Sequence, residues 1–203
     1  MNFLLLSDYY SPIVKSGSII VADLANELFT QGHNVTVVTF VDDQPYRCND
    51  VIENNIRIIR INIPIRKFGK LGRLCAEYNY SSKIVHFFKK NNNVLYEAVI
   101  CYSPSIFYGK AICWLKDNHK TKAYLIIRDI FPKWALDAGI LKKGLLYRYF
   151  KTVEKKLYGA VDIIGIESAS DLDYFVNYSL KNKAKVEVLD NWGAPVETIN
   201  KDL

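Results

Sequence analysis

The stretch NFLLLSDYYSPIVKSGSIIVADLANELFTQGHNVTVVTFV, residues 2–41, decides the fold. It opens with a short apolar run, 2–7, which is typical of a buried strand ended by turn residues. Residues 18–33 then carry apolar side chains at helical spacing, with Ser18 as a predicted N-cap and Gly32 as a predicted stop. The β-branched run NVTVVTFV follows as a second strand. Two strands joined by a helix predict a parallel β-α-β unit.

The rest of the chain repeats this alternation. Near-continuous apolar strands between amphipathic helices predict an α/β, Rossmann-like, mostly parallel sheet with helices on both faces. The segment 56–63 alternates apolar and basic residues, as a half-exposed or edge strand does. We expect one domain over 1–190, and 191–203 as the start of an interdomain linker. Further strands are expected at 97–102, 122–128, 162–167 and 185–189, and further helices at 70–90, 105–118, 133–140, 144–158 and 170–180.

The composition of the chain limits the classes of function that it can have. Of the 203 residues 50% are apolar, which excludes a disordered chain, and the net charge of +6 favours anionic partners, unless it is simply solvated surface charge. No helix-turn-helix, zinc-finger or RNA-binding signature accompanies that charge, so we expect no nucleic-acid partner. The four cysteines include no C-x-x-C pair, so we expect no metal site. The same pattern favours a reducing, cytoplasmic location. Cys101 and Cys113 lie in apolar runs and are expected to be buried.

Ligands of such sheets bind at the carboxyl ends of the strands. The loops expected at the ligand side of the sheet are therefore 8–17, 42–54, 103–105, 128–133 and 167–170. The first loop has neither the G-x-G-x-x-G dinucleotide fingerprint nor a P-loop, and we expect no cofactor. It does place Lys15, Ser16 and Gly17 before a helix, where exposed N–H groups and a lysine can bind a diphosphate. The alternative is an ordinary capped helix with a turn glycine.

The order of motifs resembles the N-terminal half of a family 4 glycosyltransferase of the GT-B fold. The opening 3–39 is similar to that family's strand, proline-containing Gly loop, helix and GH-x-V-T-V-V-T strand. YEAVICYSPSIFYG (96–109) is similar to its middle strand and turn, RDIFPKWALDAGIL (128–141) to the R-D-[LI]-[WF]-P region of its surface-polysaccharide branch, and VLDNWGAP (188–195) to the segment that leads into the second domain. That branch includes L-fucosaminyltransferases of O-antigen synthesis.

The resemblance implies a retaining transferase that needs no D-x-D-bound metal. It would move a sugar from a nucleotide-sugar donor to a lipid-linked saccharide acceptor, in bacterial O-antigen, lipopolysaccharide or capsule synthesis. Relatives bind the donor mostly through a second domain that carries two glutamates separated by seven residues. None of the eight glutamates here has that spacing. We therefore expect either part of a longer protein or a stand-alone half, inactive by itself.

The loop after the strand 122–128 supplies the predicted catalytic residue, Asp129, as an acid/base or orienting carboxylate beside the acceptor hydroxyl. The alternative is that Asp129 pairs with Arg128 or caps the following helix. Arg128 and Lys133 would neutralise diphosphate charge, or be surface charges. Further residues expected to line the acceptor or diphosphate site are Tyr102, Ser103 and Glu167, with turn formation and hinge packing as the alternatives.

Two basic amphipathic segments suggest a membrane surface. The stretch 64–74 alternates cations with apolar residues, and 142–156 adds a Lys/Arg-rich face, so contact with an anionic inner-membrane surface is predicted. Packing of each helix on the sheet is the alternative. The rival function is a non-catalytic module that binds anionic membrane or polyprenyl phosphate. The apolar start is too short for a signal peptide and has no cationic flank, and no run reaches the roughly 18 apolar residues of a spanning helix.

Overall fold

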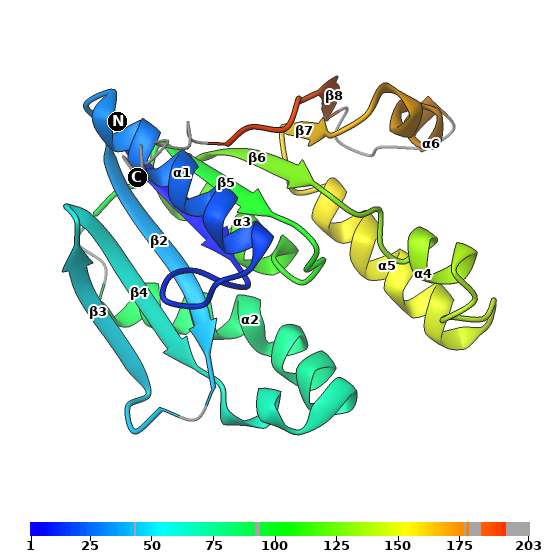
Figure 1. Cartoon of the computed structure of the whole chain (residues 1–203), viewed down its shortest axis with the longest axis horizontal. Helices are drawn as coiled ribbons and strands as arrows, with labels where there is room; N and C mark the ends of the chain where they lie inside the picture. The colour runs from blue at the N-terminus through cyan, green and yellow to red at the C-terminus, as the bar shows by residue number, and fades with distance from the viewer. Residues whose placement is uncertain (43, 92–93, 177, 179–183, 194–203) are drawn as a thin grey trace, which may run out of the picture.

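A computed structural model describes residues 1–42, 44–91, 94–176, 178 and 184–193. Within them, one eight-stranded sheet has the order β3-β4-β2-β1-β5-β6-β7-β8 (Figure 1). All neighbouring strands are parallel except β3 and β4. The predicted fold class is therefore confirmed. The strands are β1 Asn2–Ser7, β2 Asn34–Val41, β3 Cys48–Glu53, β4 Ile56–Asn62, β5 Ala98–Tyr102, β6 Lys122–Ile127, β7 Ile163–Ile166 and β8 Lys185–Val188.

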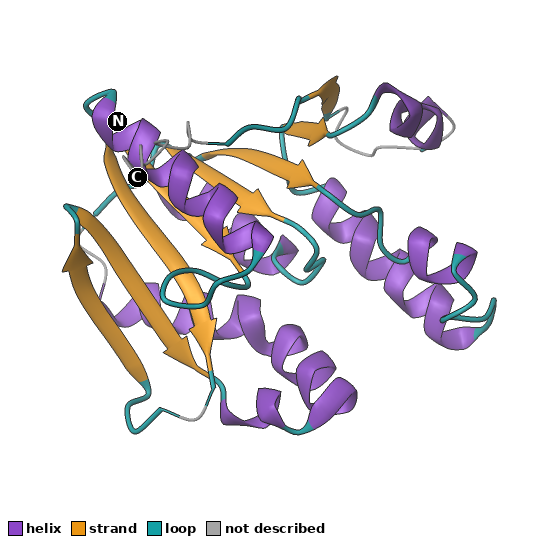
Figure 2. Cartoon of the chain, in the orientation of Figure 1, coloured by secondary structure: helices purple, strands orange, loops and turns teal. Residues whose placement is uncertain are grey.

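Helices cover both faces of the sheet (Figure 2). One face packs against α1 through Ile20, Val21 and Ala25. The other face packs against α2, α3, α5 and α6, with buried side chains such as Tyr80, Ile112 and Leu157. The helices are α1 Ser16–Thr30, α2 Gly69–Asn91, α3 Gly109–His119, α4 Lys133–Asp137, α5 Leu145–Tyr158 and α6 Leu172–Val176.

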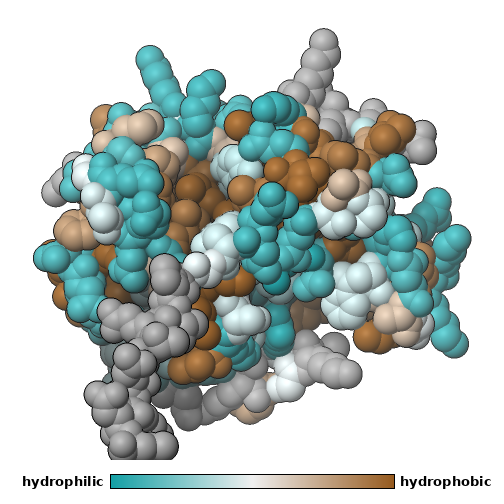
Figure 3. All heavy atoms as spheres, turned by 45° about the horizontal axis from the view of Figure 1, so that its top comes forward, coloured by the Kyte–Doolittle hydropathy of each residue, from teal (hydrophilic) through white to brown (hydrophobic). Residues whose placement is uncertain are grey.

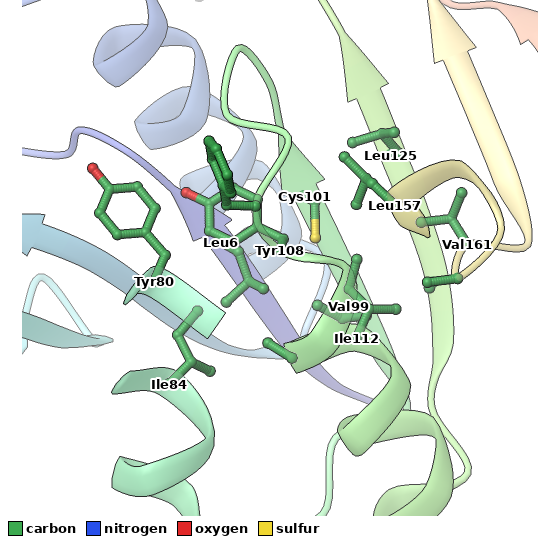
Figure 4. Close-up of a cluster of buried hydrophobic side chains, with 14 of the residues drawn as sticks. Leu6, Tyr80, Ile84, Val99, Cys101, Tyr108, Ile112, Leu125, Leu157 and Val161 are labelled. Carbon is green, nitrogen blue, oxygen red and sulfur yellow. The ribbon is translucent and has the colours of Figure 1, made fainter. Parts of the chain in front are cut away.

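The larger core lies between the central strands and the helices α2, α3 and α5. Leu6, Val99 and Leu125 project from three neighbouring strands into this layer, where they meet Ile112 and Leu157 (Figure 4). Their apolar area leaves water, which stabilises the fold by about 25 cal/mol per Å².

The prediction for the cysteines holds in one case. Cys101 on β5 is fully buried in this core, as expected. Cys113 is exposed, because it lies on the outer side of α3, whereas Ile112 and Leu115 of the same helix are buried.

The β3–β4 hairpin corrects two expectations. The segment 42–54 was expected to be a ligand-side loop, but Cys48–Glu53 forms an antiparallel edge strand. The strand β4 was expected to be half-exposed or at an edge, yet it lies between β3 and β2 and is mostly buried. Its basic side chains pair with acids of β3: Arg57 pairs with Asp50 at 2.6 Å and Arg60 pairs with Glu53 at 2.7 Å.

Candidate functional site

The first cavity lies at the point where the chain order of the strands reverses, with β1 between β2 and β5. It has a volume of about 350 Å³ and opens at the carboxyl ends of β1, β5, β6 and β7. Parallel open sheets bind their ligands at such a switch point. The lining residues are Ser7, Asp8, Tyr9, Lys15, Ser16, Gly17, Arg73, Tyr102, Ser103, Pro104, Arg128, Asp129 and Glu167.

A buried carboxylate marks the end of β1. Asp8 is 2% exposed and accepts a hydrogen bond from the Tyr108 hydroxyl at 2.7 Å. Burial, together with the negative charge of Asp8, raises the pKa of Tyr108 well above its usual value, so this tyrosine remains a donor. The Arg73 guanidinium approaches the other Asp8 oxygen to 3.7 Å and pairs with Glu77 at 2.6 Å. Although burial lowers the pKa of Arg73, these acids outweigh it and keep the side chain charged.

The start of α1 is built differently from the prediction. Ser18 is not the N-cap: the helix begins at Ser16 after Lys15, and the Ser18 hydroxyl accepts a hydrogen bond from the Lys15 N–H at 2.9 Å. The Lys15 ammonium lies 3.6 Å from the centre of the Tyr9 ring, a cation–π contact.

Gly17 allows this helix to approach the middle strand closely. A Cβ atom at this position would lie 3.1 Å from the Tyr102 ring. Burial raises the pKa of Tyr102, and Arg128 partly offsets that shift. Tyr102 is therefore a neutral hydrogen-bond donor at the cavity wall.

The loop after β6 contributes two charged residues to the cavity. Arg128 is held in place by its neighbours, whereas the Asp129 carboxylate has no such contact among the described residues. Arg128 pairs with Glu167 at 2.5 Å and donates to the side-chain oxygen of Asn191, also at 2.5 Å. The alternative that Asp129 pairs with Arg128 or caps α4 is not supported, because α4 has no side-chain cap. Within the described part of the chain, the Asp129 carboxylate takes part in no hydrogen bond or ion pair.

Two further cavities adjoin the first, and Asp129 lines all three. The second, of about 330 Å³, is mainly apolar; it shares Arg73 with the first and is walled by Leu74, Ile106, Phe131 and Trp134. The third has a volume of about 500 Å³ and is bordered by Arg128, Lys133, Trp134, Asp137, Ser170, Asp171, Asp173 and Tyr174. Trp134 lines both the second and the third cavity.

The structure thus brings together most of the predicted site. Lys15, Ser16, Gly17, Tyr102, Ser103, Arg128, Asp129 and Glu167 line the first cavity, whereas Lys133 lies at the third and pairs with Asp137. The prediction missed Asp8, Tyr9 and Arg73. The position of Asp8 directly after a buried strand was a usable signal, whereas Arg73 reaches the site from α2 and has no local signal. Of the described residues in 42–54, none lines these cavities.

The electrostatics of the first cavity are balanced. Lys15, Arg73 and Arg128 face Asp8, Asp129 and Glu167 across the same space. Such a mixture suits a ligand with both anionic and hydroxyl groups, since cations bind phosphate and carboxylates accept from hydroxyls. Among the residues that the structure describes, there is no cluster of three or more possible metal ligands. In the same part of the chain, no helix is long and apolar enough to cross a membrane.

Solved structures of GT-B glycosyltransferases share this fold. A sucrose-phosphate synthase from Thermosynechococcus elongatus matches 93% of the chain with a TM-score of 0.65 and 13% identity. A UDP-forming α,α-trehalose-phosphate synthase from Burkholderia xenovorans, in complex with glucose-6-phosphate, matches 89% with a TM-score of 0.57 and 12% identity. Another structure of the sucrose-phosphate synthase matches 95% with a TM-score of 0.59. Neither a family model nor a curated protein sequence matches.

The fold thus matches one Rossmann-like half of GT-B glycosyltransferases. The chain spans 47% of the first sucrose-phosphate synthase structure and 43% of the trehalose-phosphate synthase. At such low identities the similarity extends to the fold alone.

Proposed function

We propose that this chain is the acceptor-binding, N-terminal half of a retaining glycosyltransferase. The observation that carries the proposal is the position of Asp129: it follows β6, lines all three cavities, and its carboxylate has no hydrogen-bond or ion-pair partner among the described residues. A carboxylate in that state can accept the proton of a sugar hydroxyl or orient that hydroxyl for transfer. The likeness of the fold to one half of GT-B enzymes is consistent with this role.

The cations of the first cavity suit an anionic group on the acceptor or donor. Arg128 is held by Glu167 and Asn191, and therefore presents its guanidinium with little loss of side-chain freedom. Lys15 directly precedes α1, and Ser16 and Gly17 form its first turn, where the helix dipole favours anions. Together these groups suit the phosphate of a sugar phosphate or the diphosphate of a nucleotide sugar.

The apolar second cavity favours an acceptor with an apolar part. It shares Asp129 and Arg73 with the polar cavity, so one molecule could place a sugar and phosphate in the first and a hydrocarbon segment in the second. A saccharide linked to a polyprenyl diphosphate has that chemistry. This observation supports the finer proposal that the acceptor is lipid-linked, as in surface-polysaccharide synthesis.

The donor would bind mostly to a second domain, and we propose that 1–190 acts as the acceptor-side domain and 191–203 as the start of the connection. Asn191 and Trp192 contact the domain: Asn191 accepts from Arg128, and Trp192 donates to the carbonyl of Ile20 at 3.2 Å. Residues 194–203 lie outside the described part. The 203 residues alone are expected to bind an acceptor without transferring sugar to it.

Calorimetric titration with glucose 6-phosphate and with inorganic phosphate tests the site. Asp129→Asn should reduce the affinity for glucose 6-phosphate about tenfold, because a hydrogen bond to a charged acceptor contributes about 1.5 kcal/mol or more. The affinity for inorganic phosphate should stay unchanged. Arg128→Gln should reduce the affinity for both ligands. Asp117→Asn, which removes an exposed acid on α3, is the matched control and should alter neither. An equal effect of Asp129→Asn on both ligands, or none on either, would contradict the proposal.

A further inference from the structure

Exposed apolar side chains gather at one corner of the molecule. On the face drawn in Figure 3, apolar residues reach the surface in patches divided by hydrophilic ones. One group of exposed apolar residues lies in the segment 138–149, which joins α4 to α5 and includes the first turn of α5; we call it the α4–α5 tip. The exposed fractions are 67% for Ile140, 85% for Leu145, 51% for Leu146 and 40% for Tyr149.

This exposure corrects a simple interpretation of the periodicity of α5. The sequence places Leu145, Leu146 and Tyr149 with Phe150 and Leu157 as apolar residues of one amphipathic helix. In the structure, Phe150 and Leu157 are buried against the core, whereas Leu145, Leu146 and Tyr149 are exposed. The described part of the chain therefore leaves these three side chains uncovered or only partly covered.

The charge of the tip has a single sign. The sequence from 138 to 153 contains no aspartate or glutamate. Lys142, Lys143 and Arg148 are exposed, and none of the ion pairs within the described residues includes them. Lys133 and Lys151, just outside the tip on either side, are instead paired with Asp137 and Glu154. Three uncommitted cations therefore lie among the exposed apolar side chains.

The backbone of the tip is anchored although most of its side chains are exposed. The Leu141 side chain packs against the core, and its N–H donates to the Ala135 carbonyl at 2.8 Å. Figure 1 shows α4 and the start of α5 at the outer end of the molecule, on the side opposite to β3. A fixed, projecting loop can present its apolar groups together to a flat partner.

We propose that the α4–α5 tip docks on an anionic lipid bilayer. Leu145, Leu146 and Ile140 would enter the boundary between headgroups and acyl chains, and the three cations would contact lipid phosphates. A protein partner is disfavoured because the cores of protein interfaces are depleted in lysine, and two lysines lie between the apolar residues here. The stretch 64–74, predicted from sequence as the main membrane segment, suits this role less, since its Arg73 lines the site and pairs with Glu77.

Cosedimentation of the 203-residue chain with vesicles tests this docking. Vesicles of equal parts phosphatidylcholine and phosphatidylglycerol should bind the protein, and phosphatidylcholine alone should bind it at least tenfold more weakly, since each cation near an anionic surface contributes about fivefold in affinity. Added salt should reduce the binding to anionic vesicles. Vesicle binding does not depend on sugar transfer. It can therefore fail while the proposed function stands, and the proposed function can fail while vesicle binding is observed.

Variants locate the contact. Leu145→Glu should reduce vesicle affinity at least tenfold, because it removes an apolar group and introduces repulsion from the lipid. The matched control is Ile52→Glu, at a 75% exposed apolar residue of the edge strand β3, which should reduce it far less. Equal losses in both variants, or no vesicle binding by the unmodified chain, would overturn the proposal. So would a chain that self-associates without lipid and becomes monomeric on Leu145→Glu, because the tip would then be a protein interface.

Discussion

Two buried carboxylates in this molecule have similar neighbours and different surroundings. Asp8, at the end of β1, accepts from Tyr108, lies 3.7 Å from Arg73 and lines the first cavity. Glu154, on α5, is fully buried and lines none of the three cavities. It accepts from the hydroxyls of Tyr174 at 2.5 Å and Tyr178 at 2.8 Å and pairs with Lys151.

This difference distinguishes Glu154, which belongs to a network that stabilises the fold, from Asp8, which belongs to a candidate binding site. Both oxygens of Glu154 are engaged by hydroxyls and an ammonium, and this cluster joins α5 to α6. Arg73, by contrast, is too far from Asp8 for a hydrogen bond, and it lines the first cavity. A saturated buried network mainly stabilises the fold, whereas polar groups at a cavity wall can still bind a ligand.

The largest expected effect follows from breaking the saturated network. Glu154→Ala should reduce the free energy of unfolding by about 3 kcal/mol, because it leaves an ammonium and two hydroxyls without their acceptor. Urea denaturation measures this loss. Calorimetry with glucose 6-phosphate, below the unfolding transition, should show unchanged affinity. If affinity fell with little change in stability, the network would belong to the site and the comparison would fail.

The corresponding change at the site should cost less stability. Asp8→Asn keeps an oxygen that accepts from Tyr108 and removes the charge that faces Arg73. We expect a loss of about 1 kcal/mol in the same urea experiment, since one weak ion pair is lost and one hydrogen bond is kept. A loss as large as that of Glu154→Ala would show that Asp8 is as important for folding as Glu154.

Much of the fold could be predicted because its signals are local. The strands β1, β2 and β5 are apolar runs, and any parallel sheet brings the ends of such strands to one edge. That rule predicted Tyr102, Arg128, Asp129 and Glu167 as neighbours although they lie far apart in the sequence.

The missed features depend on distant partners. The strand β3 has the polar sequence CNDVIE and is stabilised by ion pairs with β4, so its own residues give a weak strand signal. Arg73 reaches the site from α2, and no pattern around it indicates that neighbour. The exposure of Leu145 was also invisible, because periodicity identifies an apolar helix face but cannot tell which turns of that face are covered.

Alkaline pH should weaken the saturated network. Burial and the charge of Glu154 raise the pKa values of Tyr158, Tyr174 and Tyr178 above their usual range, so these side chains stay neutral in the folded chain. In the unfolded chain they ionise near pH 10. Their contribution to stability is complete below that pH and is lost as the pH rises above it.

Tyr178→Phe isolates one of these groups. At neutral pH the variant should be about 1 kcal/mol less stable, because one hydrogen bond to a buried carboxylate is lost. Above pH 10 the difference from the unmodified chain should shrink, since the variant has one fewer hydroxyl that ionises on unfolding. Urea denaturation across this pH range measures both effects. A difference that is constant with pH would mean that Tyr178 titrates normally in the folded chain.

The smallest effects should come from two glycines, one in each region. A Cβ atom at Gly17 would lie 3.1 Å from the Tyr102 ring, and one at Gly159, which ends α5, would lie 3.1 Å from the Lys155 carbonyl oxygen. For Gly17→Ala, the better helix propensity of alanine offsets the crowding, and stability should change by no more than about 0.5 kcal/mol. Because the displaced neighbour is a wall of the first cavity, affinity for glucose 6-phosphate should fall several-fold. Gly159→Ala presses on backbone instead, so stability should fall slightly while affinity stays the same. The opposite pattern would show that the Tyr102 side of the cavity does not contact the ligand.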